Sequence, residues 1–124
     1  MIDFKNATYF KLKAINNSEG EKARSAMLVD GENIMSTFQT VRDMVIFTNK
    51  RIVSVNIKGL TGTKKDYTSL PYSKIQAFSV ETAGILDLDC ELELWFSGLG
   101  KVRFEFKSNF DIAEFNKILS NYIL

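Results

Sequence analysis

The sequence predicts a mainly β fold with α, a barrel or sandwich of about seven antiparallel strands capped by a C-terminal α-helix, with a short helix near the N-terminus. Between residues 32 and 107, short segments rich in β-branched and aromatic residues alternate with turn signals. In residues 108–124, apolar residues recur at helical spacing. The 124 residues fit a single domain, in which we expect an N-terminal arm and short helix at 1–30 packed on a main domain at 31–124.

The N-terminal helix is predicted from a capping pattern in the segment SEGEKARSAMLV. Ser18 is the expected N-cap, and Glu21 follows three residues later, as in a capping box. Ala23, Ala26 and Met27 would then lie on one side of the helix.

Seven segments have the composition and the boundaries of strands. The turn signals between them include Arg42-Asp43, Asn49-Lys50, a loop with Gly59 and Gly62, and Pro71, which lacks the N–H that a central strand needs. The expected strands are residues 32–41, 43–49, 51–57, 63–70, 73–81, 86–96 and 101–107.

The last two of these strands form a predicted hairpin through the loop SGLG. Their even-numbered positions are apolar and we expect them to face the core: Leu86, Leu88, Cys90, Leu92, Leu94, Phe96, Val102, Phe104 and Phe106. The odd-numbered positions of the first strand form an acidic row, Asp87, Asp89, Glu91 and Glu93. Because odd-numbered residues must then lie opposite odd-numbered residues, this row lies opposite or diagonal to Lys101, Arg103 and Lys107. The row is therefore interpreted as a charged sheet face.

The C-terminal segment SNFDIAEFNKILSNYIL predicts an amphipathic helix. Ser108 is the expected N-cap with Asp111 at the third helical position. The apolar stripe consists of Ile112, Phe115, Ile118, Leu119 and Tyr122. The aromatic residues expected in the core are Phe38, Phe47, Phe78, Phe104, Phe106 and Phe115, whereas Phe4, Tyr9 and Phe10 lack such a pattern and would dock on the domain or on a neighbouring subunit.

Composition limits the function classes. The 16 basic and 15 acidic residues nearly cancel, which argues against a nucleic-acid partner. The chain has no histidine, so Ser-His-Asp, Cys-His and HExxH chemistry is excluded, and with one cysteine the usual zinc ligand sets are absent. We expect no metal site, no cofactor and no enzymatic activity. Cys90 is expected to be a buried free thiol, which suits the cytoplasm, and no apolar run predicts a signal peptide or a membrane span.

Three segments resemble the bacterial pleckstrin-homology-like domains: VRDMVIFTNKRIVSV at 41–55, GLTGTKKDYTSLPYSKI at 59–75 and FSVETAGILDLDCELELWFSG at 78–98. The resemblance runs from about Leu28 to the C-terminus. It implies a pleckstrin-homology fold and, for several members, assembly into closed homo-oligomeric rings such as a pentamer. It implies no catalytic residues. The connection TVRD offers only Arg42 where lipid-binding relatives carry several basic residues, so phosphoinositide recognition and membrane contact are not expected.

The function that we expect is that of an interaction or scaffold module that assembles with itself. The hypothesised interface comprises Trp95, Glu91, Glu93 and Asp87, because an exposed tryptophan among charges is typical of a protein contact. Any other protein partner is left open.

Two rival functions remain open. The first is a peripheral binder of anionic lipid or another anionic ligand through Lys50, Arg51, Lys64 and Lys65. The second is an enzyme that uses the carboxylates of the acidic row at 87–93, either alone or with Ca²⁺ or Mg²⁺. Side chains two apart on a strand lie about 7 Å apart, which is wide for one small cation.

Overall fold

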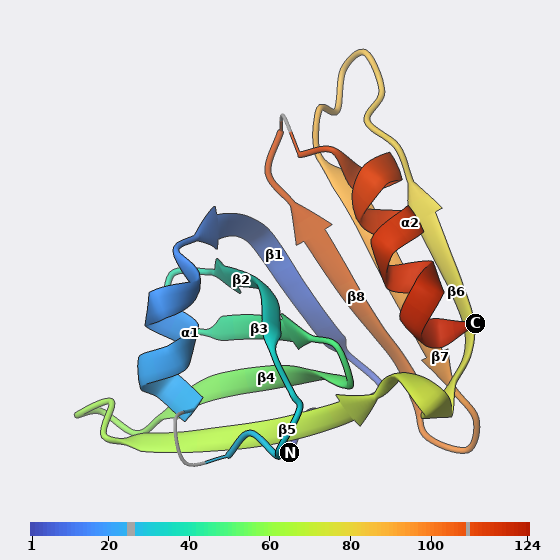
Figure 1. The fold of residues 1–124 in the computed structure, drawn as a ribbon. Helices are drawn as coiled ribbons and strands as arrows, with labels where there is room; N and C mark the ends of the chain where they lie inside the picture. Colours follow the sequence, from blue (N-terminus) through green and yellow to red (C-terminus); the bar gives the residue numbers. More distant parts are fainter. Residues whose placement is uncertain (25–26, 109) are drawn as a thin grey trace. The chain divides into compact units, whose positions relative to one another are not determined.

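The computed structural model describes residues 1–24, 27–108 and 110–124, and it confirms a mainly β chain with a short N-terminal and a longer C-terminal helix (Figure 1). Ala26 of the predicted first helix lies outside the described residues. The elements are β1 (Ala7–Ile15), α1 (Asn17–Arg24), β2 (Ile34–Gln39), β3 (Met44–Thr48), β4 (Arg51–Lys58), β5 (Lys64–Pro71), the 3-10 helix η1 (Tyr72–Lys74), β6 (Ile75–Glu81), β7 (Cys90–Phe96), β8 (Gly100–Phe106) and α2 (Ile112–Ile123).

The chain forms two compact units. One contains Met1 and Ala14–Pro71, and the other contains Ile2–Lys13 and Tyr72–Leu124. After Met1, the chain passes from one unit to the other inside β1 and again between Pro71 and Tyr72.

In the first unit, β2, β3, β4 and β5 form consecutive antiparallel pairs in the order β5-β4-β3-β2. Ile46, Val53 and Val55 form a buried cluster on this sheet, and Ile34, Met44 and Tyr67 pack against it. The predicted turns at Arg42-Asp43 and Asn49-Lys50 lie between these strands, and Gly59 and Gly62 have the positive φ angles expected of their loop.

Helix α1 packs on β2 and begins earlier than the capping pattern predicted. The side chain that caps the helix is Asn16 rather than Ser18: its carboxamide oxygen accepts the backbone N–H of Ser18 at 2.9 Å. Gly20 lies so close to β2 that a Cβ atom there would be 2.7 Å from Oγ1 of Thr37. The Thr37 hydroxyl in turn donates to the Asn17 side chain at 3.0 Å, which fixes the helix to the strand.

In the second unit the sheet order is β1-β8-β7-β6. The hairpin of β7 and β8 has the predicted parity: Leu92, Leu94, Val102 and Phe104 are fully buried, and odd residues pair with odd residues. The predicted strand start at Leu86 is wrong. Strand β7 begins at Cys90, and Leu86 and Leu88 are exposed, because neither β6 nor β8 extends far enough to pair with residues 86–89.

Strand β1 has no counterpart among the predicted elements, and it runs parallel to β8. Tyr9 stacks on Phe104 with ring centroids 5.5 Å apart, and Phe4 contacts Phe96 edge-on, whereas Phe10 is exposed. The carbonyl of Phe4 accepts the Lys101 N–H at 3.2 Å. This close approach requires glycine at position 100, where a Cβ would lie 2.5 Å from the Phe4 oxygen.

Helix α2 covers β6 and η1 and is capped by Asp111, whose carboxylate accepts the Glu114 N–H at 3.1 Å. The predicted N-cap Ser108 is therefore wrong, since it lies before the helix. Of the predicted apolar stripe, Ile112, Phe115 and Leu119 are buried, while Ile118 and Tyr122 are partly exposed. Cys90 is buried as expected. Its burial is the main cause of a raised thiol pKa, and the nearby negative charge of Asp89 raises this pKa further.

Candidate functional site

The odd-numbered residues of β7 and β8 form a charged outer face whose carboxylates have basic partners. Glu91 forms an ion pair with Arg103, in which Nε donates to Oε2 at 2.9 Å. Glu93 lies 3.7 Å from the ammonium of Lys101. The predicted interpretation of this row as a paired sheet face is confirmed for Glu91 and Glu93.

Asp89 finds its partner on β1. Lys11 has a positive φ of 55°, at the point where the pairing of β1 with β8 shifts its register between Tyr9 and Leu12. Its backbone N–H donates to Glu105 at 3.3 Å, and its ammonium pairs with Asp89 and lies 3.9 Å from Glu105. The hydrogen bond and the charge of Asp89 raise the pKa of Lys11. The strained residue therefore ties β1 to the end of the loop before β7.

Trp95 lies on the same outer face, near the end of β7, with 47% of its surface exposed. Its cross-strand neighbours are Ala77 on β6 and Lys101 on β8. The methyl group of Ala77 is too small to cover an indole ring. Glu91, Glu93 and Trp95 thus share one face, as the sequence predicted, whereas Asp87 lies in the loop that precedes the strand.

The connection between β6 and β7 projects away from the strands of its own sheet (Figure 1). We call this connection, together with the last residue of β6, the acidic loop (residues 81–89). Ile85 and Leu86 are almost fully exposed, at 95% and 99%, and Leu88 is more than half exposed. Two hydrogen bonds order the loop: Gly84 N–H donates to the Asp87 carbonyl at 2.7 Å, and Asp89 N–H donates to the Asp87 carboxylate at 3.1 Å.

The four residues of the hypothesised anion site do not lie together. Arg51 opposes Pro71 at one end of the β4–β5 hairpin, and Lys58 opposes Lys64 at the other. Seven residues of strand separate the two ends, or about 23 Å. Lys50 is exposed in the turn before Arg51, and Lys64 and Lys65 are exposed near the far turn.

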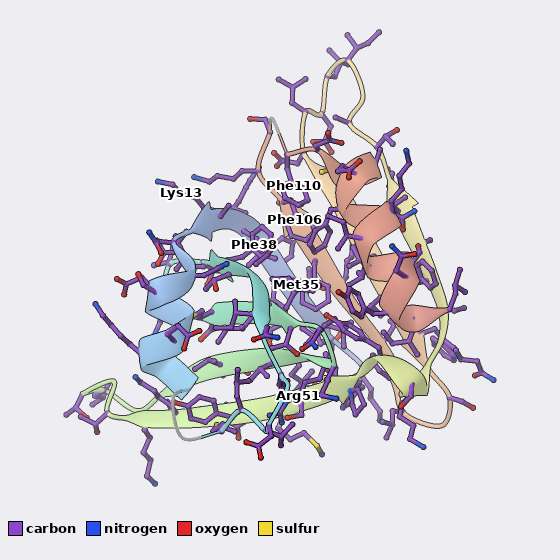
Figure 2. All side chains as sticks on the ribbon, viewed as in Figure 1. Lys13, Met35, Phe38, Arg51, Phe106 and Phe110 are labelled. Carbon is purple, nitrogen blue, oxygen red and sulfur yellow. The ribbon has the colours of Figure 1, made fainter. Side chains whose placement is uncertain are left out.

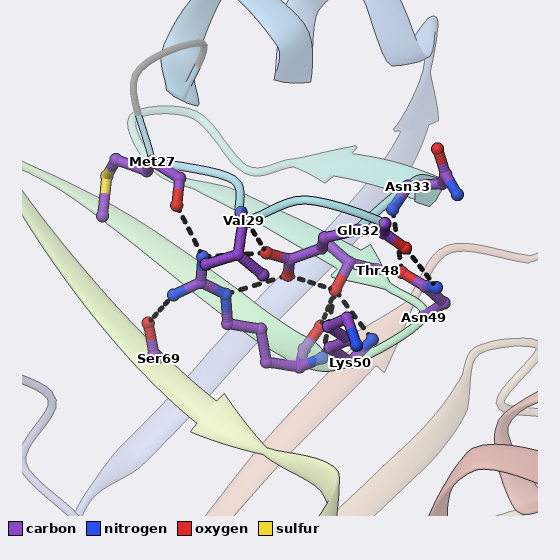
Figure 3. Close-up of polar contacts among 10 residues, drawn as sticks. Met27, Val29, Glu32, Asn33, Thr48, Asn49, Lys50 and Ser69 are labelled. Atoms are coloured by element: carbon purple, nitrogen blue, oxygen red, sulfur yellow. Dashed lines mark hydrogen bonds and ion pairs between the residues drawn. The ribbon is translucent and has the colours of Figure 1, made fainter.

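The guanidinium of Arg51 donates hydrogen bonds to Glu32, Met27 and Ser69, three residues labelled in Figure 3. Its guanidinium binds Glu32 through Nε at 2.9 Å and through Nη2 at 3.0 Å. It also donates to the Met27 carbonyl at 2.8 Å and to the Ser69 hydroxyl at 2.9 Å. Arg51 therefore joins the segment before β2 to β5, and its charge is balanced by a carboxylate.

Glu32 is the buried centre of this network, with a fully buried side chain. Its carboxylate also accepts the Thr48 hydroxyl at 2.7 Å and the Val29 N–H at 3.2 Å. Burial by itself raises the pKa of Glu32, but the hydrogen bonds from Arg51, Thr48 and Val29 outweigh it and leave the pKa below its usual value.

The lowered pKa of Glu32 predicts an acid-dependent part of the stability. The contribution is present above the unfolded-state pKa of about 4.3 and is lost as the pH falls through the lower folded-state pKa. We expect Glu32→Gln to be less stable than the native chain at about pH 7 and the difference to shrink towards about pH 3. Urea unfolding of both chains across this range measures it. An equal difference at both ends of the range would contradict the assignment.

A second exposed surface surrounds two neighbouring turns of the first unit. We call it the basic turns: Val41, Arg42, Lys58, Leu60, Lys64 and Lys65. The Arg42 guanidinium donates to the Gly59 carbonyl at 3.2 Å, which holds the β2–β3 turn against the β4–β5 turn. Val41 and Leu60 are completely exposed, and the four basic residues are exposed around them.

Sequence reasoning identified Lys64 and Lys65 but missed the other members of this surface. It also missed Glu32, which lies 19 positions from Arg51 and which no local pattern connects to it. The adjacent pair Ile85-Leu86, which breaks the alternation of the following residues, was the available signal for the exposed loop.

In residues 1–24, 27–108 and 110–124, no three acidic or cysteine side chains are grouped so that they could hold a metal ion. Neither helix of the described chain has the length and apolar character that a membrane span requires.

Comparison with known proteins gives consistent matches. Residues 3–123 match the family described as "Bacterial PH domain". The uncharacterized protein YjqA of Bacillus subtilis is 44% identical over 96 residues, which cover 76% of this chain and 77% of that protein. YozO of the same organism, also uncharacterized, is 32% identical over 110 residues, covering 89% and 95% of the two chains.

Two solved structures share the fold. A DUF1696 family protein with a pleckstrin-homology domain from Shewanella loihica superposes with a TM-score of 0.80 at 35% identity, covering 94% of this chain and all of that one. A pleckstrin-homology domain from Shewanella amazonensis gives a TM-score of 0.66 at 36% identity, with 89% and 90% covered.

Proposed function

The chain belongs to the bacterial PH domain family, and from this premise we propose that it is a non-enzymatic interaction module that assembles with copies of itself, as a ring, in the cytoplasm. The proposed contact uses the outer face of β7, with Trp95 at its centre, and the outer edge of β6. The expected interface residues Glu93 and Glu91 precede Trp95 along the same face, and Asp87 lies in the loop before β7.

The observation that carries the proposal is the exposure of Trp95 on a face whose charges are already paired. Glu91 and Glu93 have Arg103 and Lys101 as basic neighbours, which accounts for both carboxylates as members of a paired sheet face. Trp95 remains as a large, half-exposed indole whose cross-strand neighbour on β6 is only an alanine. Tryptophan is enriched among the residues that dominate protein interfaces.

The edge of β6 supports the same surface. Within the described residues, β6 pairs only with β7, and its Gln76, Ala77, Ser79 and Glu81 are exposed. An edge strand offers backbone N–H and C=O groups with which a strand of another chain can pair. Trp95 lies one strand away from this edge, so a neighbour that approaches β6 would also cover the indole.

Replacing Trp95 by alanine tests the proposal. We expect self-association to weaken by about 2 kcal/mol or about thirtyfold in the dissociation constant, as for an interface hot spot, with little change in the melting temperature. Light scattering coupled to size exclusion measures the mass over a concentration series. The matched control is Leu124→Ala, which removes an exposed apolar side chain elsewhere. A Trp95→Ala chain that assembles as the native chain does would refute the contact.

A further inference from the structure

We propose that the acidic loop of one copy docks on the basic turns of the next copy, so that the assembly is built from two different surfaces of the same chain. This inference rests on the proposed self-assembly and adds the identity of the partner surface. The interface would then include both the outer face of β7 and the acidic loop that leads into this strand.

The acidic loop has the composition of a docking element. Ile85 and Leu86 are adjacent and nearly fully exposed, and Leu88 follows them. Such a group of exposed aliphatic side chains is typical of an interaction site. Glu81 and Asp87 are exposed beside it, and among the described residues neither is joined to a basic side chain by an ion pair. A partner that is apolar at its centre and basic at its rim would fit this loop.

The loop is also held ready for such a contact. Its own hydrogen bonds at Gly84 and Asp89 order the tip, and the ion pair from Lys11 to Asp89 fixes its C-terminal end to β1. An ordered loop loses less conformational entropy on binding than a loop that must first be ordered. The aliphatic side chains are therefore displayed to solvent in a defined arrangement.

The basic turns match these requirements. Val41 and Leu60 supply exposed aliphatic side chains at two turns that the Arg42–Gly59 hydrogen bond joins. Lys64 and Lys65 are exposed and, among the described residues, have no carboxylate within ion-pair distance. The two surfaces are thus complementary both in charge and in apolar content.

A second copy explains both surfaces at once, whereas an anionic lipid surface would attract only the basic turns and would leave the acidic loop unexplained. A contact between two different surfaces is heterologous, and repeated head to tail it closes into a ring when the rotation between copies permits. Charge complementarity also selects the correct pairing of surfaces over the pairing of like with like.

The test is a charge exchange. One variant carries Asp87→Lys, a second carries Lys64→Glu with Lys65→Glu, and a third combines all three changes in one chain. We expect each one-sided variant to dissociate at about tenfold higher concentration than the native chain, and the combined variant to regain much of the association. Sedimentation velocity at low salt measures this, with Lys50→Glu as the matched control for a lysine outside the contact. Melting temperatures close to that of the native chain would show that the variants are folded.

The outcomes separate this inference from the proposed function. A native chain that stays monomeric would refute self-assembly and the inference with it. A native chain that assembles, together with one-sided variants that assemble equally well, would refute only the inference. Loss of binding to vesicles rich in anionic lipid in the Lys64→Glu, Lys65→Glu variant, with unchanged assembly, would assign the basic turns to a lipid surface and overturn the contact between copies.

The apolar part of the contact has its own test. Ile85→Ser with Leu86→Ser removes exposed side chains, so we expect no loss of stability but about tenfold weaker association. Association equal to that of the native chain would contradict a role of the loop in assembly.

Discussion

Replacing Arg51 by alanine is expected to destabilise the fold by about 3–5 kcal/mol, the cost of leaving a buried charge without its partner. The Glu32 side chain is completely buried, and Arg51 supplies its charged hydrogen bonds. Without the guanidinium, the Met27 carbonyl and the Ser69 hydroxyl also lose a donor. Urea unfolding near neutral pH measures the change in the free energy of unfolding.

Lys50→Ala is the matched control, since Lys50 is a neighbouring exposed cation, and its effect should stay within about 0.5 kcal/mol. The double change Glu32→Met with Arg51→Met should be less harmful than Arg51→Ala, because it removes the charge together with its partner. An Arg51→Ala chain as stable as the control would mean that the network contributes nothing to the fold.

Replacing Phe106 by alanine is the second change with a large expected effect, about 3–5 kcal/mol of stability. Phe106 is fully buried on β8, stacks on Phe110 with ring centroids 4.5 Å apart, and contacts Phe115 of α2 edge-on at 5.7 Å. Figure 2 shows Phe106 and Phe110 side by side. The substitution would leave a cavity under the helix and remove two aromatic contacts.

Thermal unfolding of Phe106→Ala and Phe106→Leu measures this contribution. The leucine variant should lose less stability, because it retains most of the buried volume. Phe10→Ala is the matched control, since Phe10 is exposed on β1. Equal melting temperatures for Phe106→Ala and Phe10→Ala would show that the aromatic cluster does not hold α2.

The sequence predicted burial correctly where the spacing of apolar residues matched the two-residue period of a strand. The alternation in β7 and β8 predicted which side chains are buried and that Glu91 and Glu93 meet basic residues. It failed at Leu86 and Leu88, where the same alternation continues beyond the end of the strand. Alternating apolar residues show that a segment is suited to a strand, but a strand forms only where a neighbouring strand is present to pair with it. The pairing of β6 with β7 ends at Glu81 opposite Glu91, so residues 86–89 have no partner on β6.

Strand β1 was missed for the converse reason. Its buried residues Tyr9 and Leu12 are three positions apart, because the register shifts between them at Lys11. A period of two is therefore interrupted in the middle of the strand, and the segment does not read as β-structure. Lys11 then supplies the cation for Asp89, so the missed strand also concealed one ion pair of the acidic loop.

The hypothesised anion site shows a similar limit. Lys50, Arg51, Lys64 and Lys65 are close in the sequence, but the hairpin of β4 and β5 places the two pairs near opposite ends. The three-dimensional structure is needed to see that Arg51 pairs with Glu32, and that Lys64 and Lys65 lie near Lys58 and Arg42. Charge in a sequence indicates that a surface is basic, and the fold decides which charges remain available.

The most direct measurement is the mass of the native chain in solution, determined by light scattering coupled to size exclusion at two protein concentrations. The proposed function predicts one stable mass of several subunits at both concentrations, since a closed ring leaves no surface for further growth. A mass equal to the 14.1 kDa of one chain at both concentrations would contradict self-assembly.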